Sequence, residues 1–350
     1  FFTRPTHEIV PPPDLVNGAN ATVRAFVGNG ANPLYSQGAL GPTLPNGGDG
    51  TAEARYLETV SFAQHQLAET NRWALEQLTW DLFVAYTPFP DEAEHLWRGF
   101  LEPGLPGFRQ NIADRLHPLL QQVYRLSDKL LGLLVSHRKE NTVVALISDH
   151  GMEGTHSLVA INKLLQDKGI LAIDNRGRVD LARTKAIYPA INNGYLLINS
   201  TDRKGGIVAP EERPQLVERI RELLFEVRDG DRQVITSVFD AATDGNALGV
   251  GGESGGDIYI DLSPGYEPDA KLSSADFVGK RELHGMHGFN PLRPSMRTLM
   301  VLNGPRVRAG SHLHGVRIID FAPTLAELLQ IPIPKDATGK VLYEAFSDPH

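Results

Sequence analysis

The sequence predicts an α/β fold in which a mostly parallel central sheet carries helices on both faces. Stretches typical of buried strands alternate with amphipathic helical stretches along most of the chain. One succession of strand, helix and strand, from residue 82 to residue 147, has the order of a βαβ unit. Such units place parallel strands in one sheet and cover it with their helices.

The first 50 residues are rich in Gly, Pro and Asn, as in Pro45-Asn46-Gly47-Gly48. This composition favours irregular backbone, so we expect residues 1–50 to contribute no core. Residues 51–350 are expected to form the α/β domain, with 190–285 as a smaller subdomain or insertion. The chain starts with Phe1-Phe2-Thr3-Arg4-Pro5 and shows neither an initiator Met nor a signal sequence. We therefore expect it to be part of a longer polypeptide.

The first half of the predicted domain supplies the βαβ unit. A helix is expected over residues 51–77, and it leads into a buried strand at residues 82–86. A second helix is expected over residues 112–134, where leucines recur at spacings of three and four. Residues 142–147 are almost continuously apolar and partly β-branched, which is typical of a central parallel strand.

The second half repeats the alternation with shorter strands. A helix is expected over residues 211–227, with strands at 194–199 and 257–262 and a glycine-dense loop at 245–256. A strand at 297–302 then precedes a helix at 320–329, whose Pro323 fits the first helical turn. We therefore expect one continuous α/β architecture.

Composition restricts the classes of function. The chain has 34 Lys and Arg against 42 Asp and Glu, a net charge of −8, which argues against binding duplex nucleic acid. A small phosphorylated substrate stays compatible, because bound divalent metals can supply positive charge locally. There is no Cys, so any metal must be held by His and carboxylate groups. No apolar run approaches the roughly 18 residues that a membrane span requires. Compartment and oligomeric state remain open.

The first chemical cluster follows the predicted strand at 82–86. Asp91 and His95 come shortly after Pro88 and Pro90, which suit the start of a helix. At a spacing of four residues the two side chains share a helical face and could chelate one ion. An ordinary helix start, with a favourable acidic residue and a solvated His, explains the same pattern.

The second cluster, Ser148-Asp149-His150-Gly151, directly follows the predicted strand at 142–147. Ligands bind at the carboxyl ends of strands in open α/β sheets, so Asp149 and His150 are candidate metal ligands. Adjacent residues in extended backbone point apart, so the pair could hold one ion at a turn or reach two neighbouring ions. A turn in which Asp149 caps the next helix is the alternative.

The third cluster is a predicted glycine-flanked loop that contains His284 and His287 and precedes the strand at 297–302. Either His could be a ligand, although isolated loop histidines are more often solvated. Three clusters of Asp or His near strand ends together favour a metal centre, and their oxygen and imidazole donors suit Zn²⁺ or Mn²⁺.

The motifs Asp-x-x-x-His, Ser-Asp-His-Gly-Met and Gly-x-His-Gly, in this order, resemble those of type I phosphodiesterases and nucleotide pyrophosphatases, which belong to the alkaline phosphatase superfamily. Residues 80–97, 194–208 and 304–324 also resemble predicted phosphohydrolases and phosphomutases of that superfamily. The resemblance covers nearly the whole chain after residue 51. It implies an alkaline-phosphatase-like fold and two divalent metal ions, with zinc expected and manganese as the alternative.

Carried over position by position, the resemblance implies that Asp91, His95 and His287 hold one metal ion. It implies that Asp149 and His150 hold the other, and it gives His284 no matching position. The family's early strand and its nucleophilic Thr or Ser have no counterpart in this chain, so we expect the fold to lack that segment and the chain alone to be inactive. Thr43, in Gly41-Pro42-Thr43-Leu44-Pro45-Asn46, is a rival nucleophile, but no apolar strand ending in Asp precedes it.

The expected function is metal-dependent hydrolysis of phosphate esters, either phosphodiesters or nucleotide pyrophosphates. A phosphomutase would share the fold and the metal ions but would return the phosphoryl group to its substrate. A sulfatase and an inactive binding module are further alternatives. Product analysis separates hydrolysis from transfer.

Overall fold

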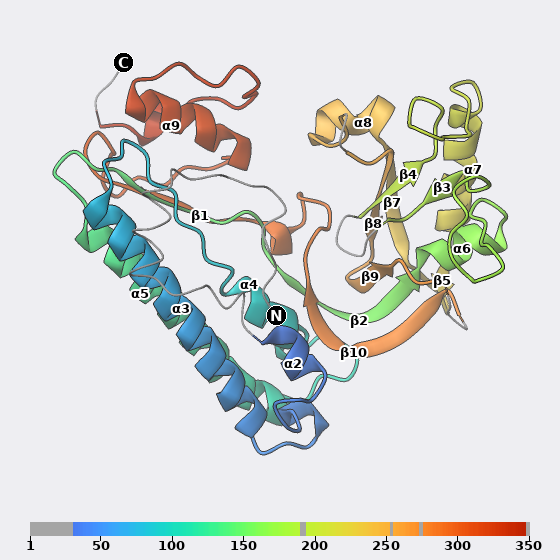
Figure 1. Cartoon of the computed structure of the whole chain (residues 1–350), viewed down its shortest axis with the longest axis horizontal. Helices are drawn as coiled ribbons and strands as arrows, with labels where there is room; N and C mark the ends of the chain where they lie inside the picture. The colour runs from blue at the N-terminus through green and yellow to red at the C-terminus, as the bar shows by residue number, and fades with distance from the viewer. Residues whose placement is uncertain (1–30, 190–193, 253–254, 273–275, 348–350) are drawn as a thin grey trace. The chain divides into compact units, whose positions relative to one another are not determined.

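The computed structural model describes residues 31–189, 194–252, 255–272 and 276–347 (Figure 1). These residues form two compact units. The first unit comprises the described residues up to Glu92, residues 121–151 and those from Arg297 onward, and the second comprises residues 93–120 and 152–296. Both units combine helices with strands, so the mixed α/β class is confirmed.

The first unit contains one long helix and the larger part of a second, whose residues 110–120 belong to the second unit (Figure 1). Helix α3 (Thr51–Gln77) has the predicted bounds, and α5 (Gln110–Ser136) extends the predicted helix slightly at both ends. The amide of Gln64 on α3 donates a hydrogen bond of 3.0 Å to the hydroxyl of Ser127 on α5. The predicted C-terminal helix is also confirmed as α9 (Phe321–Leu329), preceded by η4 (Ile318–Asp320).

The expectation of no core before residue 51 is wrong for residues 31–50, whereas residues 1–30 lie outside the described part of the chain. Helix α2 (Asn32–Ser36) and the 3-10 turn η1 (Leu44–Asn46) form here, and Tyr35 and Leu44 are buried. The fully buried carboxylate of Glu53 on α3 accepts hydrogen bonds from the Tyr35 hydroxyl at 2.6 Å and the Leu44 amide at 2.8 Å. Two apolar side chains and one buried acceptor therefore order a segment that reads as irregular.

The sheet of the first unit is a two-stranded antiparallel ribbon. Strands β1 (Val144–Ile147) and β11 (Met300–Asn303) pair with Val144 opposite Asn303 and Ile147 opposite Met300. Both lie where the sequence predicts strands. The strand predicted at residues 82–86 does not form, and Leu82, Val84 and Tyr86 are 51%, 78% and 69% exposed. A strand needs a neighbour to pair with, and no strand among the described residues pairs with this segment.

The second unit contains two larger sheets (Figure 1). In one, β2 (Glu153–Ala160) lies between β10 (Val278–Met286), which is antiparallel to it, and β9 (Gly265–Asp269), which is parallel. The other sheet is antiparallel, in the order β3 (Ala186–Ile187), β4 (Tyr195–Ile198), β8 (Ile258–Leu262) and β7 (Ile235–Asp240). A short hairpin pairs β5 (Arg228–Asp229) with β6 (Arg232–Gln233).

Helices of the second unit cover these sheets. The principal ones are α4 (Asp91–Trp97), which crosses from the first unit, α6 (Ile161–Asp167), α7 (Arg213–Phe225) and α8 (Ala241–Leu248). Helix α7 confirms the helix predicted over residues 211–227, whereas the loop predicted at 245–256 starts within α8. Leu165 of α6, Ile220 of α7 and Leu196 of β4 are fully buried in one apolar core.

The expectation of mostly parallel strands is wrong among the described residues. In the described part of the chain, β2 and β9 are the one pair of strands that run parallel, and a single bridge between Ser200 and Val208 is also parallel. An apolar strand sequence indicates that both faces are buried, but it carries no information on the direction of its neighbour. Antiparallel neighbours need only short connections, as between β3 and β4.

Among the described residues, no helix has both the length and the apolar content needed to cross a bilayer.

Candidate metal centre

Helix α4 carries the first two predicted ligands. It begins at Asp91 and continues through His95 to Trp97, so the predicted helix with a four-residue spacing is confirmed. The 3-10 turn η2 (Arg98–Leu101) follows directly and packs on β10 and β2. Because α4 is buried at Ala93 and Trp97, its orientation is fixed by packing as well as by backbone hydrogen bonds.

A backbone hydrogen bond fixes the ring of His95. Its Nδ1 lies 2.7 Å from the carbonyl oxygen of Gly285 on β10. A carbonyl oxygen can only accept, so Nδ1 carries the proton and donates it. The lone pair of the neutral ring is then at Nε2, the atom with which such a His binds a metal.

His287 lies immediately after β10 and faces the same helix. Its ring centroid is 5.1 Å from that of His95. One ligand atom each of Asp91, His95 and His287 lies within 4.8 Å of the others. Ligand atoms bound to a tetrahedral zinc ion at about 2.0–2.1 Å stand somewhat closer together, and side-chain rotation can close that difference. The donor set of two imidazoles and one carboxylate therefore fits a zinc ion.

His284 has a different role from the other two histidines. It lies within β10, where the sequence predicts a loop, and its ring stacks on His95 with centroids 5.5 Å apart. Burial lowers the pKa of His284 to about 3, with further lowering from the charges of Arg281 and His95. The ring of His284 is therefore neutral at physiological pH and stacks against the ring of His95.

The second predicted pair lies in the first unit, directly after β1. Nε2 of His150 is 3.6 Å from a carboxylate oxygen of Asp149 and 3.8 Å from one of Asp91. Nδ1 of His150 lies 3.0 Å from the Gly151 carbonyl, which again places its proton on Nδ1. Nε2 of His150 and the two carboxylate oxygens then converge, an arrangement that a bound metal ion would stabilise.

A cluster around Arg293 was missed by the sequence analysis. The guanidinium of Arg293 donates to Glu153 at 2.5 Å and to Asp261 at 2.7 Å, and it stacks over Phe289. Asp261 also accepts from the backbone amide of Asn290, and Glu153 accepts from Ser295. The cluster ties the segment after His287 to β2 and β8. No motif marks these residues, since each is a single polar residue in an ordinary context.

Thr43, the rival nucleophile, is buried at the start of η1. Its hydroxyl accepts a hydrogen bond of 3.1 Å from the side-chain amide of Asn46. The Thr43 hydroxyl therefore has a structural role in the local turn.

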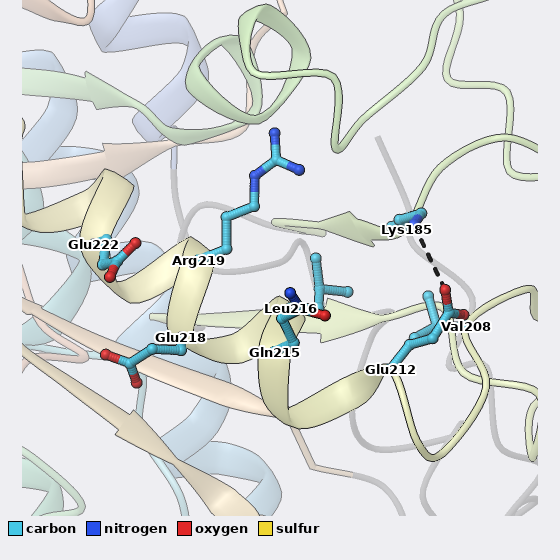
Figure 2. Close-up of a pocket in the computed structure, with 8 residues that line it drawn as sticks. All are labelled: Lys185, Val208, Glu212, Gln215, Leu216, Glu218, Arg219 and Glu222. Atoms are coloured by element: carbon cyan, nitrogen blue, oxygen red, sulfur yellow. Dashed lines mark ion pairs between the residues drawn. The ribbon is translucent and has the colours of Figure 1, made fainter.

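A separate surface hollow lies in the second unit, beside α7 (Figure 2). Lys185 and Glu212 form an ion pair of 4.0 Å at one end, and Glu218, Arg219 and Glu222 lie along the helix. Its lining mixes charged side chains of both signs with the apolar side chains of Val208 and Leu216, whereas pockets for small ligands are lined mainly by apolar residues.

Comparison with known proteins gives a family and a fold. The model of the family "Type I phosphodiesterase / nucleotide pyrophosphatase" matches residues 17–290, more than half of the chain. Human ectonucleotide pyrophosphatase/phosphodiesterase 5 has a similar structure, with a TM-score of 0.50 and 16% sequence identity. That alignment covers 81% of this chain and 64% of the human protein.

Two further proteins are similar over different extents. An alkaline phosphatase structure is 18% identical with a TM-score of 0.44, over 89% of this chain and 54% of that protein. A 2,3-bisphosphoglycerate-independent phosphoglycerate mutase of Cereibacter sphaeroides (strain ATCC 17029 / ATH 2.4.9) is 40% identical over 62 residues, which are 18% of this chain and 11% of the mutase. This chain thus spans less than two thirds of the relatives that it matches.

The fold is similar to that of the human ectonucleotide pyrophosphatase/phosphodiesterase 5, and the chain belongs to the type I phosphodiesterase/nucleotide pyrophosphatase family.

Proposed function

We propose that the chain provides the metal ligands of a two-metal phosphoric ester hydrolase that acts on phosphodiesters or nucleotide pyrophosphates. The proposal is carried by the convergence of Asp91, His95 and His287 to within 4.8 Å. Its class of reaction follows from membership of the family. Asp149 and His150 are proposed as ligands of the second ion, and zinc is the expected metal because the donors are imidazole and carboxylate.

Backbone carbonyl groups of this chain orient two of the proposed metal ligands. His95 is held by the Gly285 carbonyl with Nε2 as the ligand atom, and His150 is held in the same way by the Gly151 carbonyl. Divalent ions in such a centre, when bound, supply positive charge that stabilises the phosphoryl oxygens and the leaving oxygen in the transition state. The hydroxyl nucleophile is proposed to be a Thr or Ser outside this chain.

Metal content tests the proposal directly. Full-length protein is equilibrated with a zinc salt, dialysed to remove unbound ions, and its zinc content is measured by elemental mass spectrometry. We expect about two zinc ions per chain. In His287→Ala, zinc content and hydrolysis of bis(4-nitrophenyl) phosphate should fall together, because one of three neighbouring ligands is lost. The loss of affinity should exceed the roughly 10–100-fold that changes around a ligand usually cause.

The control is His65→Ala, since His65 is exposed on α3, away from the three ligand clusters in the sequence. It should leave zinc content and turnover unchanged. Fewer than two bound ions in the wild type, or full occupancy in His287→Ala, would contradict the ligand assignment.

The similarity to a phosphoglycerate mutase over 62 residues makes phosphoryl transfer the second candidate. Product analysis decides between them. Release of free phosphate or a nucleoside monophosphate indicates hydrolysis, whereas return of the phosphoryl group to another position of the substrate indicates a mutase. Bound metal without turnover on either substrate class would favour a binding module.

A further inference from the structure

The contact between α4 and β10 is unusually close at one residue. A Cβ atom added to Gly285 would lie 2.1 Å from the carbonyl oxygen of Glu94 and 2.8 Å from Cβ of Arg98. Both distances are below the 3.0 Å that real Cβ atoms keep from their neighbours. The helix can therefore reach its position on the strand only because residue 285 has no side chain.

Two other glycines continue this contact. A Cβ on Gly99 of η2 would lie 2.5 Å from the backbone nitrogen of His284, and one on Gly154 of β2 would lie 2.8 Å from Cα of Gly99. Backbone therefore packs directly on backbone from α4 through η2 to β2. Backbone atoms cannot move aside as the end of a flexible side chain can, so a methyl group added at this contact would push the helix away from the strand.

Gly285 also makes the hydrogen bond that orients His95. Its carbonyl accepts the proton of His95 Nδ1 at 2.7 Å, and His287 follows two residues later. A displacement of α4 from β10 would lengthen this bond and separate His95 from His287. The residue that allows the close approach is thus the residue that selects the tautomer of the ring.

We propose that Gly285 is a positioning residue of the metal centre, which it serves by seating α4 on β10 and by holding His95 in the Nδ1–H tautomer. This role rests on the proposed function, since it presumes that His95 binds a metal ion through Nε2. Outer contacts of this kind orient metal-binding histidines, and their loss costs about 10–100-fold in affinity.

The same strand offers a matched control. Gly279 lies on β10 as well, but a Cβ added there has no atom within 4 Å. Neither Gly279 nor Gly285 has the positive φ that disfavours other residues. Gly285→Ala and Gly279→Ala therefore differ in the space around the added methyl group and not in backbone strain.

The experiment combines zinc affinity with the tautomer of His95 in the metal-free chain. Zinc affinity is measured by competition with a chromophoric chelator, and the tautomer by ¹⁵N chemical shifts of the imidazole nitrogens at a pH where the ring is neutral. We expect the Nδ1–H form in the wild type. Gly285→Ala should bind Zn²⁺ about 10–100-fold more weakly and should show the Nε2–H form, whereas Gly279→Ala should match the wild type in both readouts.

The outcomes separate this role from the proposed function. A wild type that binds zinc, together with Gly285→Ala binding it equally well, overturns the role of Gly285 alone. A wild type that binds no zinc overturns the metal centre and the positioning role with it. If Gly285→Ala does not fold, the wild-type tautomer decides, because an Nε2–H ring in the wild type contradicts the proposal and an Nδ1–H ring supports it.

Discussion

The two units differ in how completely they bury their apolar residues. In the second unit, strands β3, β4, β8 and β7 and helices α6 and α7 share one continuous core. Its exposed large apolar side chains are Leu181, Ile207 and Leu292. The first unit exposes many more among the described residues: Leu34, Phe62, Leu82, Val84, Tyr86, Tyr124, Ile147, Leu299, Val301, Ile318, Ile319, Ile331, Ile333 and Tyr343.

The second unit thus buries most of its large apolar side chains in one core, whereas the first leaves many of them in contact with solvent. Soluble proteins rarely expose large contiguous apolar patches, and the exposed residues of the first unit include both strands of its sheet. His95 and His287, by contrast, stand on the well-packed second unit, on α4 and after β10. The other proposed ligands, Asp91, Asp149 and His150, belong to the first unit.

The largest expected change in the free energy of unfolding comes from the buried ion pairs of Arg293 in the second unit. In Arg293→Met, Glu153 and Asp261 lose their common partner, and breaking a buried ion pair costs about 3–5 kcal/mol. All three side chains are at most 13% exposed. Urea unfolding followed by circular dichroism measures the loss. Arg72→Met is the matched change in the first unit, where the pair with Glu69 is solvated, and it should cost at most about 1 kcal/mol.

The pH dependence of Arg293→Met gives an independent check. Burial raises the pKa of Glu153, while Ser295 and Arg293 lower it, so removal of Arg293 raises it further. A carboxyl group whose folded pKa exceeds its unfolded value destabilises the fold as pH rises through the folded pKa. The deficit of the variant should therefore be smaller at pH 5 than at pH 8. A deficit independent of pH would show that Glu153 is not the group left uncompensated.

A pair of identical truncations compares the units directly. Leu196 on β4 is fully buried, whereas Leu299 beside β11 is 51% exposed. Leu196→Ala should destabilise the chain by about 2–5 kcal/mol through lost burial and a cavity. Leu299→Ala should cost well under half of that, since its side chain already contacts solvent. If both variants lost the same free energy of unfolding in urea titrations, the first unit would bury its sheet in solution. The two units would then not differ in how well they bury their apolar residues.

Periodicity predicts the helices well because it reports on one chain segment at a time. Helices α3, α5, α7 and α9 lie where apolar spacing places them. The candidate ligands were also found locally, as Asp and His residues near predicted strand ends. That Asp91, His95 and His287 lie together is shown by the structure, while their binding of a metal stays a prediction.

Features that depend on partners distant in the sequence escaped prediction. The direction of β2 relative to β10 depends on connections, the core position of Tyr35 depends on Glu53, and the tautomer of His95 depends on the carbonyl of Gly285. Arg293 is a single residue whose three hydrogen-bond partners, Glu153, Asp261 and Leu262, lie on β2 and β8. None of these contacts leaves a periodic or motif signal in the sequence.

The segment at residues 82–86 provides the smallest expected effect and the sharpest test of the contrast. Its continuous run of apolar residues predicts a buried strand, whereas in the structure Val84 is 78% exposed. Val84→Lys should therefore change the free energy of unfolding by no more than about 0.5 kcal/mol, as exposed substitutions usually do. A buried strand would instead have to bury an unpaired ammonium group, which costs several kcal/mol. A loss of that size in a urea titration would show that the segment is covered in solution, and the first unit would then be as well packed as the second.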